Sequence, residues 1–154
     1  MIQLEEGMNA PVFEGIDQSG NEIKLSGFRG KKVILYFYPK DNTPGCTAEA
    51  CNLRDNYDSL LKKGFAVVGV SPDTEKSHKG FAGKYQLPFP LIADTSKKIV
   101  NDYGIWGEKK MYGKSYFGVI RTTFVIDEKG VIEKIISKVN TAGHTEQIFN
   151  MYNQ

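Results

Sequence analysis

The chain has 154 residues, of which 40% are hydrophobic and 25% are charged, a composition typical of one folded domain spanning residues 1–154. Its 20 basic and 18 acidic residues are interspersed along the chain, which excludes a basic arm that binds nucleic acid. Glu5 and Glu6 stand where a secretory signal needs basic residues, and no apolar stretch approaches the ~18 residues of a membrane span, so we expect a cytoplasmic protein with no membrane partner and with reduced thiols.

The first predicted element is a small hairpin in "VFEGIDQSGNEIKL", with its turn at residues 19–21. Residues 31–39 and 64–72 are apolar runs bounded by charged residues or proline, as in buried parallel strands. Between these runs, apolar side chains recur at helical spacing and predict a helix from about residue 44 to 63. The residues on this face are Cys46, Ala50, Leu53, Tyr57 and Leu60.

The second half of the chain predicts two further helices, in "SPDTEKSHKGFAGKYQL" and "DTSKKIVNDYG". A strand hairpin follows in "RTTFVIDEKGVIEKIIS", and a last helix in "GHTEQIFNMYN". Together these elements predict an α/β fold with a mixed central sheet, helices on its faces and an N-terminal β-hairpin.

The loop "PKDNTPGCT" follows the carboxyl end of a predicted strand, where α/β sheets place their ligand sites. Pro44 suits the first turn of a helix, so we expect Cys46 in that turn, where free N–H groups and the helix dipole favour a thiolate. The alternative is a buried, unreactive core thiol, because Cys46 lies on the apolar face of the helix.

Cys51 is the second of the two cysteines and lies five positions after Cys46. In an intact helix this spacing separates the Cα atoms by roughly 8.6 Å, whereas a disulfide tolerates at most ~7 Å. A bond between them therefore requires the first helical turns to unwind. The alternative is a tolerated helix cysteine with no partner.

Two cysteines at this spacing and the distant His78 and His144 do not match a structural zinc site, so we expect no metal, and we expect both histidines to be solvated at helix ends. The aromatic side chains of residues 103–117 are expected in the core or in the wall of the site. They are Tyr103, Trp106, Tyr112, Tyr116 and Phe117.

The segment "YPKDNTPGCTAEAC" resembles the active-site loop of the peroxiredoxins, whose signature of Pro, Thr or Ser, and Cys is met by Pro39, Thr43 and Cys46. Residues 103–127, "YGIWGEKKMYGKSYFGVIRTTFVID", resemble the bacterioferritin comigratory protein subfamily, also called Q-type peroxiredoxins. The resemblance extends over nearly the whole chain and implies a thioredoxin-like fold with an N-terminal extension.

By this resemblance Cys46 corresponds to the peroxidatic cysteine and Cys51 to a resolving cysteine, with Thr43, Pro39 and Arg121 completing the pocket. Read singly, Arg121 could be a solvated strand-edge charge, Thr43 a helix cap and Pro39 a strand terminator. Glu49 stands at a position that is commonly acidic in the subfamily, where it either orients the loop or is simply solvated.

The resemblance implies a thiol peroxidase that reduces hydrogen peroxide and organic hydroperoxides, is reduced by a thioredoxin-like or glutaredoxin-like protein, and needs no dissociable cofactor. We expect a monomer, with a dimer through the active-site face left open. The alternatives are a thioredoxin-like disulfide reductase, disfavoured because no proline follows Pro90, and a peroxide-sensing redox switch.

Overall fold

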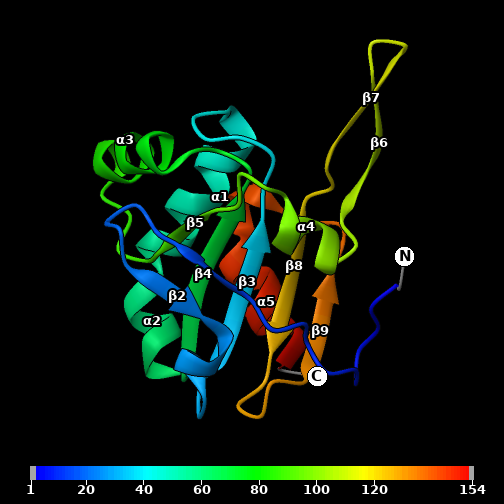
Figure 1. Ribbon diagram of the computed structural model, residues 1–154. Helices are drawn as coiled ribbons and strands as arrows, with labels where there is room; N and C mark the ends of the chain where they lie inside the picture. The colour runs from blue at the N-terminus through cyan, green and yellow to red at the C-terminus, as the bar shows by residue number, and fades with distance from the viewer. Residues whose placement is uncertain (1–2, 153–154) are drawn as a thin grey trace.

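The computed structural model describes residues 3–152. A mixed five-stranded sheet in the order β5-β4-β3-β8-β9 forms its centre (Figure 1). Strands β3, β4 and β5 are parallel, β8 is antiparallel to β3, and β9 is antiparallel to β8. The five strands span Lys32–Phe37 (β3), Phe65–Ser71 (β4), Leu91–Ala93 (β5), Thr122–Ile126 (β8) and Ile132–Ile136 (β9). The predicted mixed sheet is confirmed.

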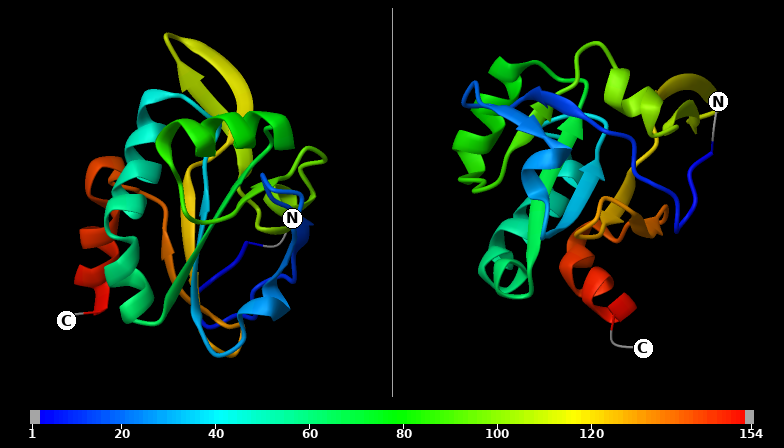
Figure 2. Two further views of the ribbon diagram at one scale, coloured as in Figure 1. Left: turned by 90° about the vertical axis from the view of Figure 1, so that its left-hand side faces the viewer. Right: turned by 60° about the horizontal axis from the view of Figure 1, so that its bottom comes forward.

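Helices cover both faces of this sheet (Figure 2). They span Pro44–Asp55 (α1), Tyr57–Lys62 (α2), Glu75–Tyr85 (α3), Lys98–Asp102 (α4) and His144–Tyr152 (α5), with short 3-10 turns at Leu25–Phe28 (η1) and Thr141–Gly143 (η2). The predicted last helix extended to residue 153, which lies outside the described residues.

Alternation along β3 divides the core into two layers, because successive strand residues point to opposite faces. Ile34 and Tyr36 pack in one buried cluster with side chains of α1, α2, α3 and α5. Leu35 and Phe37 pack in the other, with the N-terminal segment and α4. The first cluster includes Cys46, so the apolar face of α1 holds that thiol against the sheet.

The helix predicted from residue 44 to 63 is interrupted once. Asn56 leaves helical geometry, with φ −109° and ψ 12°, and separates α1 from α2. Its side-chain amide donates a hydrogen bond to the carbonyl of Asn52, 2.8 Å away. Asparagine favours such local bonds over the helical ladder, which explains the break.

The N-terminal hairpin is confirmed as β1 (Glu14–Ile16) and β2 (Glu22–Lys24). Gly20 supplies a positive φ of 80° at its turn. Within the described residues, no helix is both long and apolar enough to cross a bilayer.

A second hairpin, β6 (Trp106–Met111) with β7 (Lys114–Val119), was not predicted. Tyr112 and Gly113 form its tip with φ of 53° and 75°, values typical of a two-residue turn in which Asn or Gly is usual. Tyrosine at the first position concealed the turn in the sequence. The expectation of a core position is confirmed for Tyr103, which is buried, whereas Tyr112, Tyr116 and Phe117 are exposed and lie outside the core.

Candidate active site

Cys46 lies at the start of α1, beyond the carboxyl end of β3. Pro44 occupies the first helical position and Thr43 the N-cap, so Cys46 lies in the first turn, as predicted. Its side chain is almost completely buried, at 1% exposure. The first turn of a helix has free N–H groups and the positive end of the helix dipole, which favour negative charge at its residues.

Arg121 immediately precedes β8, and its side chain extends to the Cys46 sulfur. Its Nη2 atom donates a hydrogen bond to Cys46 Sγ over 3.2 Å. A Cβ atom on Gly45 would lie 3.2 Å from the same Nη2, so glycine at this position leaves room for the guanidinium. Two residues separated by 75 positions thus meet as the sequence predicted, and Arg121 is not a solvated edge charge.

Glu49 holds the other side of the guanidinium. Arg121 Nη1 donates to Glu49 Oε1 over 2.7 Å, and the carboxylate is fully buried. Burial raises the pKa of Glu49 to about 7, against the opposing charge of Arg121. The second oxygen, Oε2, has no hydrogen-bond partner among residues 3–152. The interpretation of Glu49 as a solvated residue is wrong.

His144 lies behind Glu49 at the start of α5. Its Nε2 atom is 3.6 Å from Glu49 Oε2 and 2.8 Å from Thr123 Oγ1, while Nδ1 donates to Gln147 Oε1 over 3.0 Å. Burial lowers the pKa of His144, so the neutral ring is favoured and Nε2 accepts a hydrogen bond from Thr123. The prediction of a solvated helix-end histidine is wrong, and no local sequence signal indicated this contact.

Thr43 and Pro39 lie on the loop that leads to Cys46. The Thr43 hydroxyl donates to the carbonyl of Lys40 over 2.8 Å and makes no capping bond to α1. Both side chains are partly buried. This loop therefore has a defined conformation before any substrate binds.

Cys51 lies on the same helix as Cys46, and both are free thiols. Cys51 is partly exposed, whereas Cys46 is buried. The helix between them is continuous, so the structure contains the thiol pair in the helical arrangement that the sequence predicted.

A buried polar cluster, also missed, fixes the opposite side of the loop. The Asp41 carboxylate accepts hydrogen bonds from Tyr38 over 2.7 Å and from Ser77 over 2.8 Å, and lies 2.7 Å from His78 Nδ1. The Asp41 N–H donates to Asp73 over 2.8 Å. His78 is completely buried, which again contradicts the prediction of a solvated histidine.

These side chains have the spacing of a metal site, but their contacts to one another explain their positions. His78 Nε2 also donates to the carbonyl of Ile92 over 2.9 Å, so both ring nitrogens are engaged. The cluster ties the loop after β3 to β4, α3 and β5.

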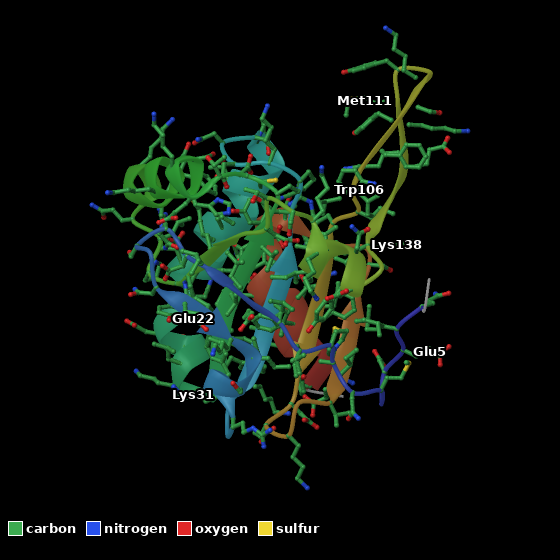
Figure 3. The ribbon with its side chains drawn as sticks, in the orientation of Figure 1. Glu5, Glu22, Lys31, Trp106, Met111 and Lys138 are labelled. Atoms are coloured by element: carbon green, nitrogen blue, oxygen red, sulfur yellow. The ribbon has the colours of Figure 1, made fainter. Side chains whose placement is uncertain are left out.

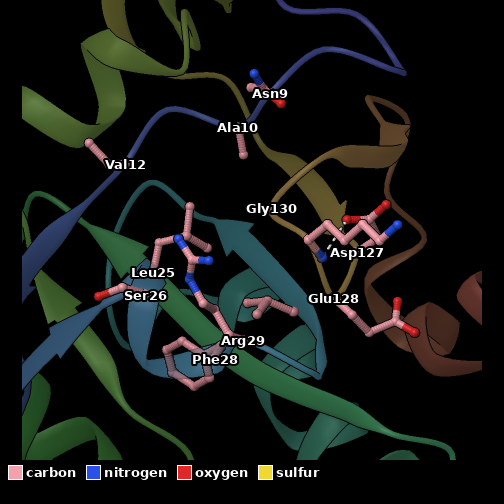
Figure 4. Close-up of a pocket in the computed structure, with 12 residues that line it drawn as sticks. Asn9, Ala10, Val12, Leu25, Ser26, Phe28, Arg29, Asp127, Glu128 and Gly130 are labelled. Carbon is pink, nitrogen blue, oxygen red and sulfur yellow. Dashed lines mark hydrogen bonds between the residues drawn. The ribbon is translucent and has the colours of Figure 1, made fainter.

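A cavity of about 340 Å³ lies at the other end of the sheet (Figure 4). Val33 at the start of β3 and residues 127–130 of the β8–β9 turn are among its lining residues. Cys46 follows the opposite end of β3, so this cavity is separate from the thiol site.

Comparison with known proteins agrees with this geometry. Residues 7–135 match the AhpC/TSA family. A peroxiredoxin bcp of Coxiella burnetii is 46% identical over 147 residues, which are 96% of this chain and 97% of that protein. Peroxiredoxin Bcp of Escherichia coli strain K12 is 42% identical over 150 residues, 97% of this chain and 96% of that protein.

The structure of the Xanthomonas campestris bacterioferritin comigratory protein superposes with a TM-score of 0.88 and 30% identity, over 97% of this chain and 98% of that chain. The fold and the site therefore define a thiol peroxidase with the thioredoxin-like architecture. Within the AhpC/TSA family, the chain belongs to the Bcp, or Q-type, peroxiredoxins.

Proposed function

We propose that the protein reduces hydrogen peroxide and organic hydroperoxides at Cys46, and that Cys51 resolves the oxidised form as an intramolecular disulfide. The observation that carries this proposal is the Arg121 guanidinium, which donates one hydrogen bond to Cys46 Sγ and another to the buried Glu49. A fixed positive charge at the sulfur stabilises a thiolate, and its N–H groups can also bind peroxide oxygens.

In the first step the Cys46 thiolate attacks one peroxide oxygen. The S–O bond forms as the O–O bond breaks, and the departing oxygen leaves with the electron pair and takes up a proton as water or an alcohol. Arg121, the Thr43 hydroxyl and the N–H groups of the first turn of α1 are the donors that would stabilise the charge on that oxygen. Cys46 becomes a sulfenic acid.

In the second step the Cys51 sulfur attacks the Cys46 sulfur, a disulfide forms and water leaves. The intact α1 keeps the two residues too far apart for this bond, so the helix start has to unwind. A thioredoxin-like dithiol protein then returns both cysteines to thiols.

Pro39 is partly buried on the loop before Cys46 and would shield the site from water. Organic hydroperoxides are included among the substrates because the Xanthomonas campestris relative was studied for alkyl peroxide reduction. We place the activity in the cytoplasm, where reductants regenerate thiols, and in a monomer, as the resemblance to the Q-type subfamily favours.

The test is rapid mixing of the reduced protein with one equivalent of hydrogen peroxide, with free thiols counted over time. Wild type should lose two thiols, Cys51→Ser one, and Cys46→Ser none at a comparable rate. Loss in all three proteins that is no faster than for a free thiol in solution would refute the peroxidase mechanism. Loss of one thiol in wild type would refute the role of Cys51 alone.

A further inference from the structure

The β6–β7 hairpin projects from the end of the molecule that carries the active site (Figures 1 and 2). Its two strands form a sheet of their own, separate from the central sheet. At its base, the N–H of Ile120 donates to the carbonyl of Ile105 over 2.7 Å, and Arg121 is the next residue. The hairpin therefore leads directly into the guanidinium that contacts Cys46.

The hairpin carries the whole surplus of positive charge. Residues 106–119 contain Lys109, Lys110 and Lys114 but only one acid, Glu108. The chain has 20 basic and 18 acidic residues, so the rest of it has 17 of each. This local surplus attracts a negatively charged partner to the hairpin.

Exposed apolar side chains accompany these charges. Met111 at the end of β6 (Figure 3) is 56% exposed. Tyr112 at the tip is 96% exposed and Phe117 on β7 is 66% exposed. Large apolar side chains that gather on one exposed element, with charges around them, are typical of a surface that contacts another molecule.

One face of the hairpin carries a lysine beside an aromatic ring. Lys109 and Tyr116 are directly opposed across the strands and share this face, with the Lys109 ammonium 5.8 Å from the Tyr116 ring. Burial lowers the pKa of Lys109, the charge of Arg121 lowers it further, and the charge of Cys46 opposes both. The charges of Arg121 and Cys46 therefore act on this lysine of the hairpin.

We propose that this hairpin is the docking surface for the protein that reduces the Cys46–Cys51 disulfide, and that this partner is a small acidic dithiol protein. The proposal rests on the disulfide of the proposed function. A partner thiolate attacks one sulfur of the disulfide, a mixed disulfide forms, and the other cysteine leaves as a thiolate. The second partner thiol then breaks the mixed disulfide, so two electrons pass from the dithiol to Cys46 and Cys51.

The position of the hairpin favours contact with a partner of domain size. The attacking sulfur has to reach bonding distance at the start of α1, and the hairpin stands beside that position and projects past it. A second copy of the chain is a poor occupant, because two hairpins with surplus positive charge repel each other. An anionic lipid surface would match the charge, and the experiment separates it from the protein partner.

The test compares two charge-reversed proteins of equal net charge. Lys110→Glu with Lys114→Glu alters the hairpin, whereas Lys31→Glu with Lys129→Glu alters exposed lysines at the opposite end of the sheet. Each pair changes the net charge from +2 to −2. Both proteins are oxidised with hydrogen peroxide, disulfide formation is verified by thiol counting, and the rate of reduction is measured with an acidic thioredoxin and, separately, with dithiothreitol.

The hairpin variant should be reduced by thioredoxin about tenfold more slowly than wild type at low salt, with a smaller difference at high salt. The opposite-end variant should keep the wild-type rate, and dithiothreitol should reduce all three proteins equally. Tyr112→Ser should also slow reduction of the disulfide by thioredoxin. Its control, Val12→Ser, removes another exposed apolar side chain and should leave that rate unchanged.

Three results would each overturn the docking proposal. Thioredoxin could reduce the hairpin variant as fast as wild type, or it could reduce both charge variants equally slowly. Dithiothreitol could also reduce the hairpin variant more slowly than wild type by the same factor as thioredoxin does. The proposal would also be overturned by an unchanged thioredoxin rate together with lost binding to phosphatidylglycerol vesicles, which would assign the hairpin to a lipid surface. If peroxide forms no disulfide, the proposed function fails instead, and the docking comparison proceeds on protein oxidised with diamide.

Discussion

Replacing Glu49 by glutamine should change how the stability of the protein depends on pH. Burial raises the pKa of Glu49 from 4.5 to about 7, so the folded protein holds this proton more tightly than the unfolded chain. Its contribution to stability is complete below pH 4.5 and is lost as the pH rises through 7. At ~1.36 kcal/mol for each pKa unit, the loss amounts to about 3 kcal/mol. The amide that replaces the carboxylate in Glu49→Gln keeps an oxygen for Arg121 and cannot ionise.

The measurement is urea unfolding at several pH values between about 4.5 and 8.5, with both cysteines changed to serine so that thiol ionisation does not contribute. The free energy of unfolding of the Glu49 protein should fall with rising pH by about 3 kcal/mol relative to the Glu49→Gln protein. His144 Nε2 lies 3.6 Å from Glu49 Oε2, so the difference between the two proteins reports Glu49 together with its effect on His144. If the free energies of unfolding of the two proteins change with pH in parallel over this range, the assignment of a buried carboxylate with a raised pKa is refuted.

Two further predictions concern the residues around the thiols. Arg121→Lys keeps the charge but cannot donate to Cys46 and Glu49 from one planar group, so the second-order rate constant with hydrogen peroxide should fall by about 10²-fold in stopped-flow experiments; an unchanged constant would contradict the role of the guanidinium. Asn52→Ala removes the hydrogen bonds that join α1 to Ala142 and Thr145 and should lower the free energy of unfolding by about 2 kcal/mol. A loss below about 0.5 kcal/mol would show that these bonds do not hold α1.

Much of the fold was predictable because the responsible signals are local. The apolar run at residues 31–39 and the helical spacing that begins at Cys46 each specify an element without reference to distant residues. The β6–β7 hairpin was missed because Tyr112 occupies a turn position with positive φ, and because its strands carry lysines and exposed aromatics instead of an apolar face. Such a hairpin has no core that could leave a pattern in the sequence.

The residues of the candidate site also divide into those with a local sequence signal and those without one. Cys46, Thr43 and Pro39 lie on one loop and could be found from a single stretch, and Arg121 was found through the family resemblance. His144 and the cluster around Asp41 could not be found, because their partners lie far away in the sequence and a buried histidine has no local signature. The burial of His78 and His144 was wrongly predicted because polar residues near the ends of predicted helices are commonly exposed.

Two polar networks limit the part of α1 that has to open for the proposed disulfide to form. Asp41 is fixed on one side by Asp73 and His78, and Asn52 on the other by η2 and α5. The segment between them contains both thiols and Glu49, so unwinding also carries this carboxylate out of the core. An ionised Glu49 is costly to bury, and opening should therefore be easier above pH 7 than below it.

Glu49 would then have two consequences: it orients Arg121 in the folded site and favours opening once it is ionised. In quenched-flow experiments, disulfide formation after a single peroxide pulse should be slower in Glu49→Gln than in wild type at about pH 8, and the two rates should converge at about pH 6. The two proteins differ only in the group at position 49, so the ratio of their rates isolates the carboxylate. A ratio that is constant across this pH range would show that opening does not depend on the charge of Glu49, and that the helix start unwinds for other reasons.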